Sequence, residues 1–185
     1  VRLLLSKSDI DFNRAMENGG TALYIASEKN HVEVVRLLLS KSGIDINKAT
    51  DKGTTALFVA SQKAHVEIVR LLLLKSDIDI KKAADGGFTA LWVASNYGHV
   101  EVVRLLLLKS DIDINKAMGE GGTALYIASY FGHVEVVHLL LSRSDIDINK
   151  AMKDGATALI MASQCGRVEV VQLLLSKSDI DINKA

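Results

Sequence analysis

The sequence contains no proline and a single cysteine, Cys165, among its 185 residues. One cysteine cannot form a disulfide within the chain, so a small fold held together by internal disulfides is excluded. Free cysteine is typical of reducing compartments, and we expect an intracellular, cytoplasmic location. Because proline is absent, the turns must depend on glycine, asparagine and aspartate.

An excess of charge and a long apolar run are also missing. Lys plus Arg and Asp plus Glu both number 22, so no net positive field favours nucleic acid or an anionic membrane surface. No apolar run reaches the roughly 18 residues of a membrane-spanning helix. The chain begins with Val1 inside a repeated pattern, and we expect it to be a piece of something longer.

What the sequence does have is a short segment that recurs at a fixed spacing. Thr21-Ala-Leu-Tyr-Ile-Ala-Ser27 returns in similar form, and each threonine lies 34 residues after the previous one. A fixed period of this length predicts a stacked array, in which each unit buries its apolar face against its neighbours. We expect a single array over residues 1–185, made of a half unit and five full units: 1–14, 15–48, 49–82, 83–116, 117–150 and 151–184.

Each unit predicts two helices and an extended segment. Thr21 is a suitable N-cap for a short first helix, and the apolar run from Val32 to about Ser40 predicts a second helix with one polar stripe. Alternation in Ile44-Asp-Ile-Asn47 predicts an extended leg, followed by a turn at a glycine. Asn30 or glycine follows the first helix, as a left-handed C-terminal residue requires, but Ala64 takes that place in the second unit, where we expect local irregularity.

These motifs resemble the ankyrin repeat. Thr-Ala-Leu-Tyr-x-Ala-Ser, Gly-His-Val-Glu-Val-Val and Leu-Leu-Leu match its pattern over essentially the whole chain, although alanine and mostly an aromatic replace the family's Pro and His. The unit is also one residue longer than usual. The resemblance implies an all-α solenoid of helix-turn-helix units with extended fingers, and a protein-binding groove on the fingers and first helices. It implies no enzyme activity and no cofactor.

Other motifs predict chemistry only weakly. Asp111-Ile-Asp-Ile-Asn115 begins like a calcium loop, but Gly122 replaces the bidentate glutamate. The glycines of 119–124 imitate a dinucleotide fingerprint without a surrounding βαβ unit. The histidines recur singly with the scaffold, and Cys165 has no candidate base, so we expect neither a metal site nor a catalytic residue.

The units differ from one another mainly at the finger tip and around the first helix. Unconstrained loops drift, but drift does not predict exposed aromatic residues, which are enriched at binding surfaces. Six of the nine aromatic residues lie in the third and fourth units. The resemblance places them in the groove. We therefore predict a protein-binding surface made of Gln62, Lys63, Phe88, Trp92, Asn96, Tyr97, Glu120, Tyr126, Tyr130 and Phe131.

The leading hypothesis for function is a non-catalytic scaffold that binds a protein partner, but not nucleic acid or a membrane. One alternative is a structural or self-associating array without a specific partner. Another is an engineered ankyrin binder, which the drift at Arg36, Arg70, Arg104, His138 and Gln172 disfavours. Because the two end faces derive from one repeating interface, we also expect weak head-to-tail association.

Overall fold

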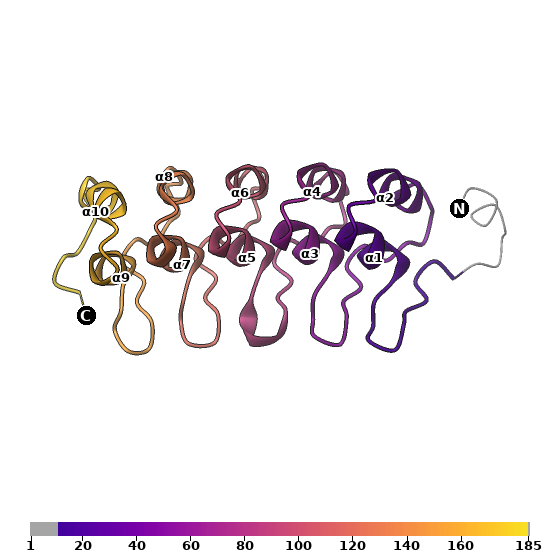
Figure 1. The fold of residues 1–185 in the computed structure, drawn as a ribbon, viewed down its shortest axis with the longest axis horizontal. Helices are drawn as coiled ribbons and strands as arrows, with labels where there is room; N and C mark the ends of the chain where they lie inside the picture. Colours follow the sequence, from indigo (N-terminus) through magenta and orange to yellow (C-terminus); the bar gives the residue numbers. More distant parts are fainter. Residues whose placement is uncertain (1–10, 185) are drawn as a thin grey trace.

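The computed structural model describes residues 11–184 and consists of antiparallel helix pairs stacked in a row (Figure 1). The predicted half-unit segment Val1–Leu5 lies outside the described residues. Five inner helices follow the fingers directly: α1 (Ala22–Glu28), α3 (Ala56–Gln62), α5 (Ala90–Asn96), α7 (Ala124–Phe131) and α9 (Ala158–Gln164). Five outer helices alternate with them: α2 (Val32–Leu39), α4 (Val66–Leu73), α6 (Val100–Leu107), α8 (Val134–Leu141) and α10 (Val168–Leu175). Within the described residues no strand forms, apart from an isolated bridge between Ala15 and Thr21.

Each inner helix begins at the threonine that marks the repeat. Thr21 has extended backbone angles, and its hydroxyl accepts a hydrogen bond from the Tyr24 amide at 3.2 Å. Thr89 caps α5 in the same way, through the Trp92 amide at 3.1 Å. These bonds satisfy an amide that has no partner inside the helix. The predicted N-caps are confirmed.

The turn between an inner and an outer helix requires a left-handed residue. Asn30 has φ of 58° and Ala64 has φ of 56°, and the glycines at the equivalent positions also have positive φ. The expectation of irregularity at Ala64 is wrong. The His65 amide donates to the Ala60 carbonyl at 2.9 Å, and the His31 amide donates to the Ala26 carbonyl at the same distance. His65 Nε2 lies 3.2 Å from the Glu28 carbonyl oxygen of the preceding unit, and His99 Nε2 of the following unit lies 2.9 Å from the Gln62 carbonyl oxygen. Contacts with both neighbouring units therefore hold the turn in which Ala64 adopts the strained conformation.

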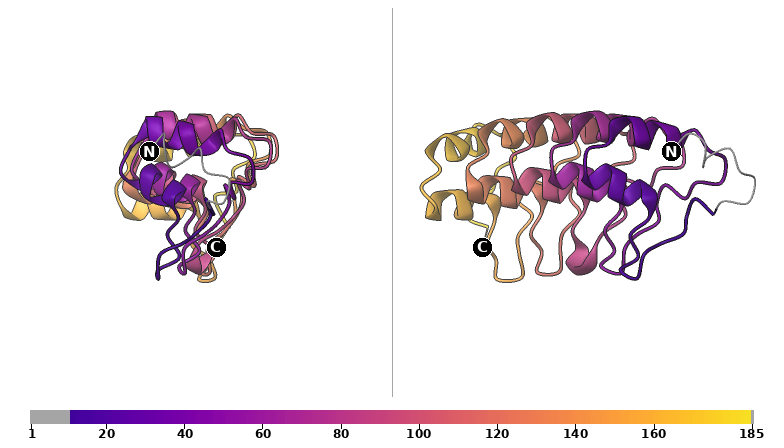
Figure 2. Two further views of the ribbon diagram at one scale, coloured as in Figure 1. Left: turned by 90° about the vertical axis from the view of Figure 1, so that its right-hand side faces the viewer. Right: turned by 45° about the vertical axis from the view of Figure 1, so that its right-hand side comes forward.

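The inner and outer helices form two layers (Figure 2). Their buried apolar side chains form one core cluster that extends from Leu23 to Leu174. Outer helices begin at the predicted residue, and α2 ends at Leu39, with Ser40 as its C-cap. Val35, Ile68 and Leu106 are fully buried within the core cluster. Burial of each such side chain contributes about 1.5–3 kcal/mol. The described residues contain no helix that is long and apolar enough to cross a membrane.

Legs (residues 40–48 and their equivalents) connect each outer helix to the next finger. The predicted extended leg is wrong in its second half, where a turn forms at Ile46 and Asn47 and the Lys48 amide donates to the Asp45 carbonyl at 3.4 Å. The alternation still buries isoleucine, since Ile46 and Ile114 are each 2% exposed.

An asparagine follows each of these isoleucines, and its side chain joins one leg to the next. The Asn47 amide donates to the Asp77 carbonyl at 2.7 Å, and its oxygen accepts from the Asp79 amide at 2.8 Å.

Fingers (residues 15–20 and their equivalents) are hairpins that extend below the inner helices (Figure 1). In one of them, the Thr50 amide donates to the Thr54 carbonyl at 3.0 Å. Adjacent finger tips are also joined, because the Gly119 amide donates to the Gly86 carbonyl at 2.9 Å. The fingers therefore form a continuous row in a fixed register.

Candidate functional site

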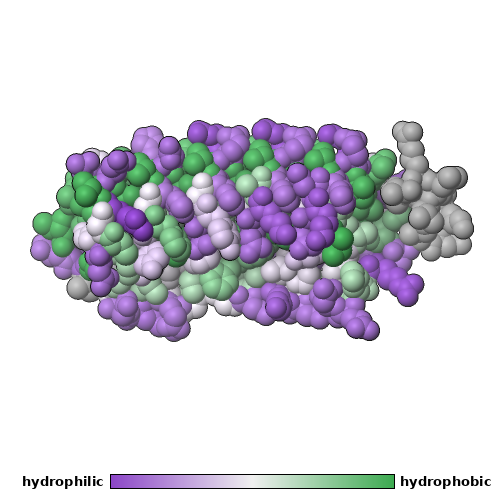
Figure 3. Space-filling model, in the orientation of Figure 1, coloured by the Kyte–Doolittle hydropathy of each residue, from purple (hydrophilic) through white to green (hydrophobic). Residues whose placement is uncertain are grey.

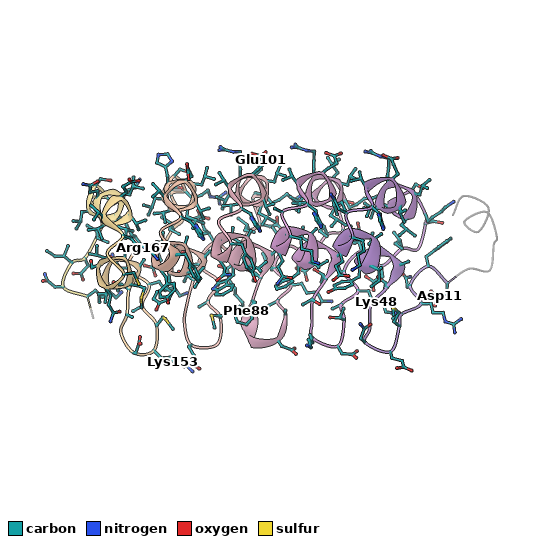
Figure 4. The ribbon with its side chains drawn as sticks, viewed as in Figure 1. Asp11, Lys48, Phe88, Glu101, Lys153 and Arg167 are labelled. Carbon is teal, nitrogen blue, oxygen red and sulfur yellow. The ribbon has the colours of Figure 1, made fainter. Side chains whose placement is uncertain are left out.

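The fingers and inner helices form one side of the molecule, and the outer helices form the opposite edge. Figure 3 shows hydrophilic residues along the finger tips, hydrophilic and hydrophobic residues in alternation along the outer helices, and a mixed, mostly paler surface between them over α5 to α9. In Figure 4, Lys153 lies at a finger tip, Phe88 lies above another finger, and Glu101 lies on the outer edge. We call the surface of the inner helices and finger tips the inner surface.

Three aromatic side chains are exposed on the inner surface. Tyr97, the C-cap of α5, is 52% exposed, and Tyr130 and Phe131, at the end of α7, are 39% and 42% exposed. The Tyr130 and Phe131 rings meet edge to face, with centroids 4.8 Å apart. This arrangement leaves ring faces available for a ligand.

Phe88 and Trp92 are only half-buried, and they pack against each other. Their rings meet at an angle of 61°, with centroids 4.6 Å apart. The Phe88 ring lies against Gly86, where an added Cβ would approach it to 2.8 Å. The Trp92 indole nitrogen is buried without a hydrogen-bond partner. This pair therefore fixes the third finger against α5 and offers less free surface than Tyr97, Tyr130 and Phe131.

Tyr126 connects α7 to the last finger. Burial raises the pKa of its hydroxyl, and the nearby carboxylate of Asp154 raises this pKa further. Tyr130 adds a smaller contribution in the same direction. Asp154, which was not among the predicted residues, thus lies beside the aromatic side chains.

The repeated histidines position the ends of the inner helices. His99 Nε2 lies 2.9 Å from the Gln62 carbonyl oxygen, and His133 Nε2 lies 3.0 Å from the Asn96 carbonyl oxygen. Because a carbonyl oxygen only accepts, Nε2 carries the proton in each bond. Arg167 replaces histidine in the last unit and makes the same connection, from its Nε to the Tyr130 carbonyl at 3.0 Å. A residue whose role is to donate to this carbonyl can be replaced by another donor, so the arginine agrees with a structural role for the histidines.

The same histidines support the exposed rings. Tyr97 stacks on His99 with centroids 5.7 Å apart, and Phe131 stacks on His133 with centroids 5.9 Å apart. The recurrence of the histidine was visible in the sequence. The sequence did not show that each histidine bonds a carbonyl group of the preceding unit and stacks on an aromatic ring of its own unit.

The four remaining predicted residues lie around these rings. Gln62 ends α3, and Lys63, its C-cap, forms an ion pair with Glu28 at 3.5 Å. Asn96 ends α5, and Glu120, in the fourth finger, pairs with Lys153 at 3.4 Å. The predicted set thus follows the inner surface from α3 to α7.

The inner surface continues beyond the predicted set through three side chains at the position of Trp92 and Tyr126. These are Tyr24, Phe58 and Ile160, all of them at least partly exposed. Because they occupy the same repeat position as Trp92 and Tyr126, the sequence could have placed them in the predicted binding surface.

Residues 11–184 show no cluster of metal-binding side chains. This part of the chain contains no group of three or more His, Cys, Asp or Glu side chains that could hold a metal ion. Asp111 to Asn115, which resembled a calcium loop, form a leg in which Asn115 donates to the Asp145 carbonyl at 2.7 Å. Cys165 lies beside Met161, with the sulfur atoms 3.9 Å apart.

Comparison with known families agrees with the stacked helix pairs. A family model described as ankyrin repeats in three copies matches residues 1–84, 48–118 and 92–185. The chain belongs to the ankyrin repeat family. Ankyrin repeats are generally protein-interaction modules and are typically not catalytic. A search of curated proteins finds no match.

Proposed function

We propose that this ankyrin repeat chain is a non-catalytic scaffold that binds a protein partner on its inner surface. The observation that carries the proposal is the exposure of Tyr97, Tyr130 and Phe131 together on neighbouring inner helices. Large, rigid rings lose little conformational entropy on binding and bury a large area, so they dominate many protein interfaces.

A purely structural array does not explain these rings. The same positions hold Glu28 and Lys29 in the first unit, which shows that the fold accepts charged residues there. Those residues sit on the same turn and leave the stacking unchanged. Exposed aromatic residues are therefore not needed for the solenoid, and binding supplies a reason for their presence.

Affinity capture with the intact chain, followed by titration of each purified candidate partner, tests the proposal. We expect Tyr97→Ala or Tyr130→Ala to weaken binding by about 30-fold, which corresponds to about 2 kcal/mol at a central aromatic contact. The unfolding midpoint should change little, because both rings are exposed.

Leu74→Ser combined with Leu108→Ser is the matched control. These leucines end the outer helices α4 and α6 and are 76% and 75% exposed, and serine occupies the equivalent positions 40, 142 and 176. The control removes exposed apolar surface from another part of the molecule and should leave affinity unchanged. Equal loss of affinity in the control and in the aromatic variants would contradict the assignment.

A further inference from the structure

The finger tips beside the exposed rings are predominantly acidic. The last three tips hold three carboxylates, from Asp85, Glu120 and Asp154, and one ammonium group, from Lys153. All four side chains are exposed, and Lys153 is paired with Glu120. Lys150, on the leg before the last tip, donates to the Asn115 carbonyl at 3.0 Å. Lys82 and Lys116 occupy the same place on the two preceding legs, and Lys82 donates to the Asn47 carbonyl at 2.9 Å. The tips themselves, with three carboxylates and one ammonium group, therefore carry an excess of negative charge, while the lysines lie on the legs behind them.

This charge is held at a fixed position relative to the rings. The Gly119 amide donates to Gly86 at 2.9 Å, and the Lys153 amide donates to Glu120 at 3.0 Å, so backbone bonds join the three tips. Each finger leads directly into the first residue of an inner helix, and Tyr97 and Phe131 lie at the other end of that helix. The last tip also lies close to α7, because the Asp154 carboxylate acts on the Tyr126 hydroxyl, and Tyr130 lies one helical turn after Tyr126.

The exposed faces of the rings favour the same kind of ligand group as the carboxylates. Tyr97 and Phe131 each have one face on a histidine, Phe131 also meets Tyr130, and both side chains remain partly exposed. Arginine stacks on aromatic faces and forms paired hydrogen bonds with carboxylates. An apolar side chain alone would use the rings and leave the acidic tips unmatched.

We infer that the partner presents a segment in which arginine accompanies an apolar side chain, with the apolar group on Tyr97, Tyr130 and Phe131 and the guanidinium group toward the acidic tips. The inference rests on the proposed function and specifies the chemistry of the partner. Charge complementarity of this kind sets partner choice and the rate of association.

A library of random peptides displayed on phage provides the probe. Peptides are selected on the intact chain after removal of those that bind a Tyr97→Ala, Tyr130→Ala, Phe131→Ala variant. We expect the selected peptides to be enriched in arginine next to apolar residues. A neutral variant, with Asp85→Asn, Glu120→Gln and Asp154→Asn, should bind them about tenfold more weakly, because each exposed ion pair contributes a few-fold.

The matched control removes three carboxylates from the outer helices through Glu33→Gln, Glu135→Gln and Glu169→Gln. This control should leave affinity within about twofold, since charges beyond roughly 10 Å are largely screened. A second check replaces arginine in the peptide by glutamine, and the neutral variant and the intact chain should then bind that peptide equally.

The outcomes separate the two proposals. Peptides that depend on the rings but lack arginine, or that bind the neutral variant and the intact chain equally, would overturn the arginine inference and leave the proposed function standing. Failure to obtain any peptide that depends on the rings would overturn the proposed function and, with it, this inference.

Discussion

At the scale of single residues, four inner helices contain a buried serine whose hydroxyl group makes no hydrogen bond. Ser27, Ser61, Ser95 and Ser129 are fully buried, and their hydroxyl groups have no hydrogen-bond partner. Such a hydroxyl has lost its hydration without compensation, which typically costs about 1–3 kcal/mol. Alanine fits the same space and favours the helix more strongly.

We therefore predict that Ser95→Ala raises the free energy of unfolding by about 1 kcal/mol, measured by urea denaturation. Ser163→Ala is the control, because the Ser163 hydroxyl is exposed and donates to the Leu159 carbonyl at 2.8 Å. The control should show no gain. A lower stability of Ser95→Ala would mean that its hydroxyl has a partner in solution.

Ala64 offers a second change at this scale. Its φ of 56° is a left-handed conformation, which costs an L-residue about 1–2 kcal/mol. Glycine removes this strain but gains freedom in the unfolded chain, so we expect Ala64→Gly to stabilise the protein by about 0.5–1 kcal/mol in thermal unfolding.

The reverse change tests the same reasoning at an equivalent position. Gly98 has φ of 69°, and an added Cβ would lie 2.6 Å from His133 Nδ1. Gly98→Ala should therefore lower the melting temperature. A gain in stability for both substitutions, or a loss for both, would be inconsistent with strain at this turn.

At the scale of elements, one leg interrupts the asparagine ladder. Lys81 occupies the position of Asn47 and Asn115, whose side chains join adjacent legs. We predict that Lys81→Asn restores the bonds to Asp111 and Asp113 and stabilises the chain by about 1 kcal/mol in urea denaturation.

Asn115→Ala is the matched opposite change, because it removes the hydrogen bonds that Asn115 makes to the backbone of Asp145 and Asp147. It should destabilise the chain by a similar amount. If Lys81→Asn leaves the midpoint unchanged while Asn115→Ala lowers it, the third leg differs in geometry from the others.

The helices could be predicted from the sequence, whereas the ladders could not. Capping by Thr21 and the apolar faces of the outer helices are local patterns, with periods that the sequence displays directly. The bonds of Asn47 and His99 join residues 30 to 37 positions apart. Neither residue type specifies such a partner without the stacked geometry.

The candidate site was predictable only in part, for a similar reason. Comparison of units identified Tyr97, Tyr130 and Phe131, because aromatic residues there depart from the other units. The repeat position of Trp92 indicated that it faces partly into the stack, but its packing against Phe88 depends on how the third finger lies on α5 and was not visible in the sequence. The proximity of Asp154 to Tyr126 likewise depends on how one finger packs beside the preceding inner helix.

At the scale of the whole molecule, the last described helix is more exposed than its equivalents inside the stack. Leu175 on α10 is 51% exposed, whereas its equivalent Leu141 is 5% exposed. The interfaces of the stack are of one repeating kind, so apolar surface of a second 185-residue chain would cover Leu175 and bury apolar area.

We therefore predict weak, concentration-dependent association, measured as a rise in mass by light scattering over about a hundredfold range of concentration. Leu175→Lys should reduce the rise, because it places a charge in the proposed contact. Leu74→Lys, on an outer helix, should not. A constant monomeric mass would exclude this contact.

The central claim is that the inner surface, around Tyr97, Tyr130 and Phe131, is where a protein partner binds. Hydroxyl-radical footprinting of the chain with and without a selected ligand tests it most directly. The claim predicts that oxidation of these three rings falls severalfold in the complex, while oxidation of the more exposed Leu74 and Leu108 stays unchanged. Protection of the two leucines, with the rings oxidised as before, would contradict it.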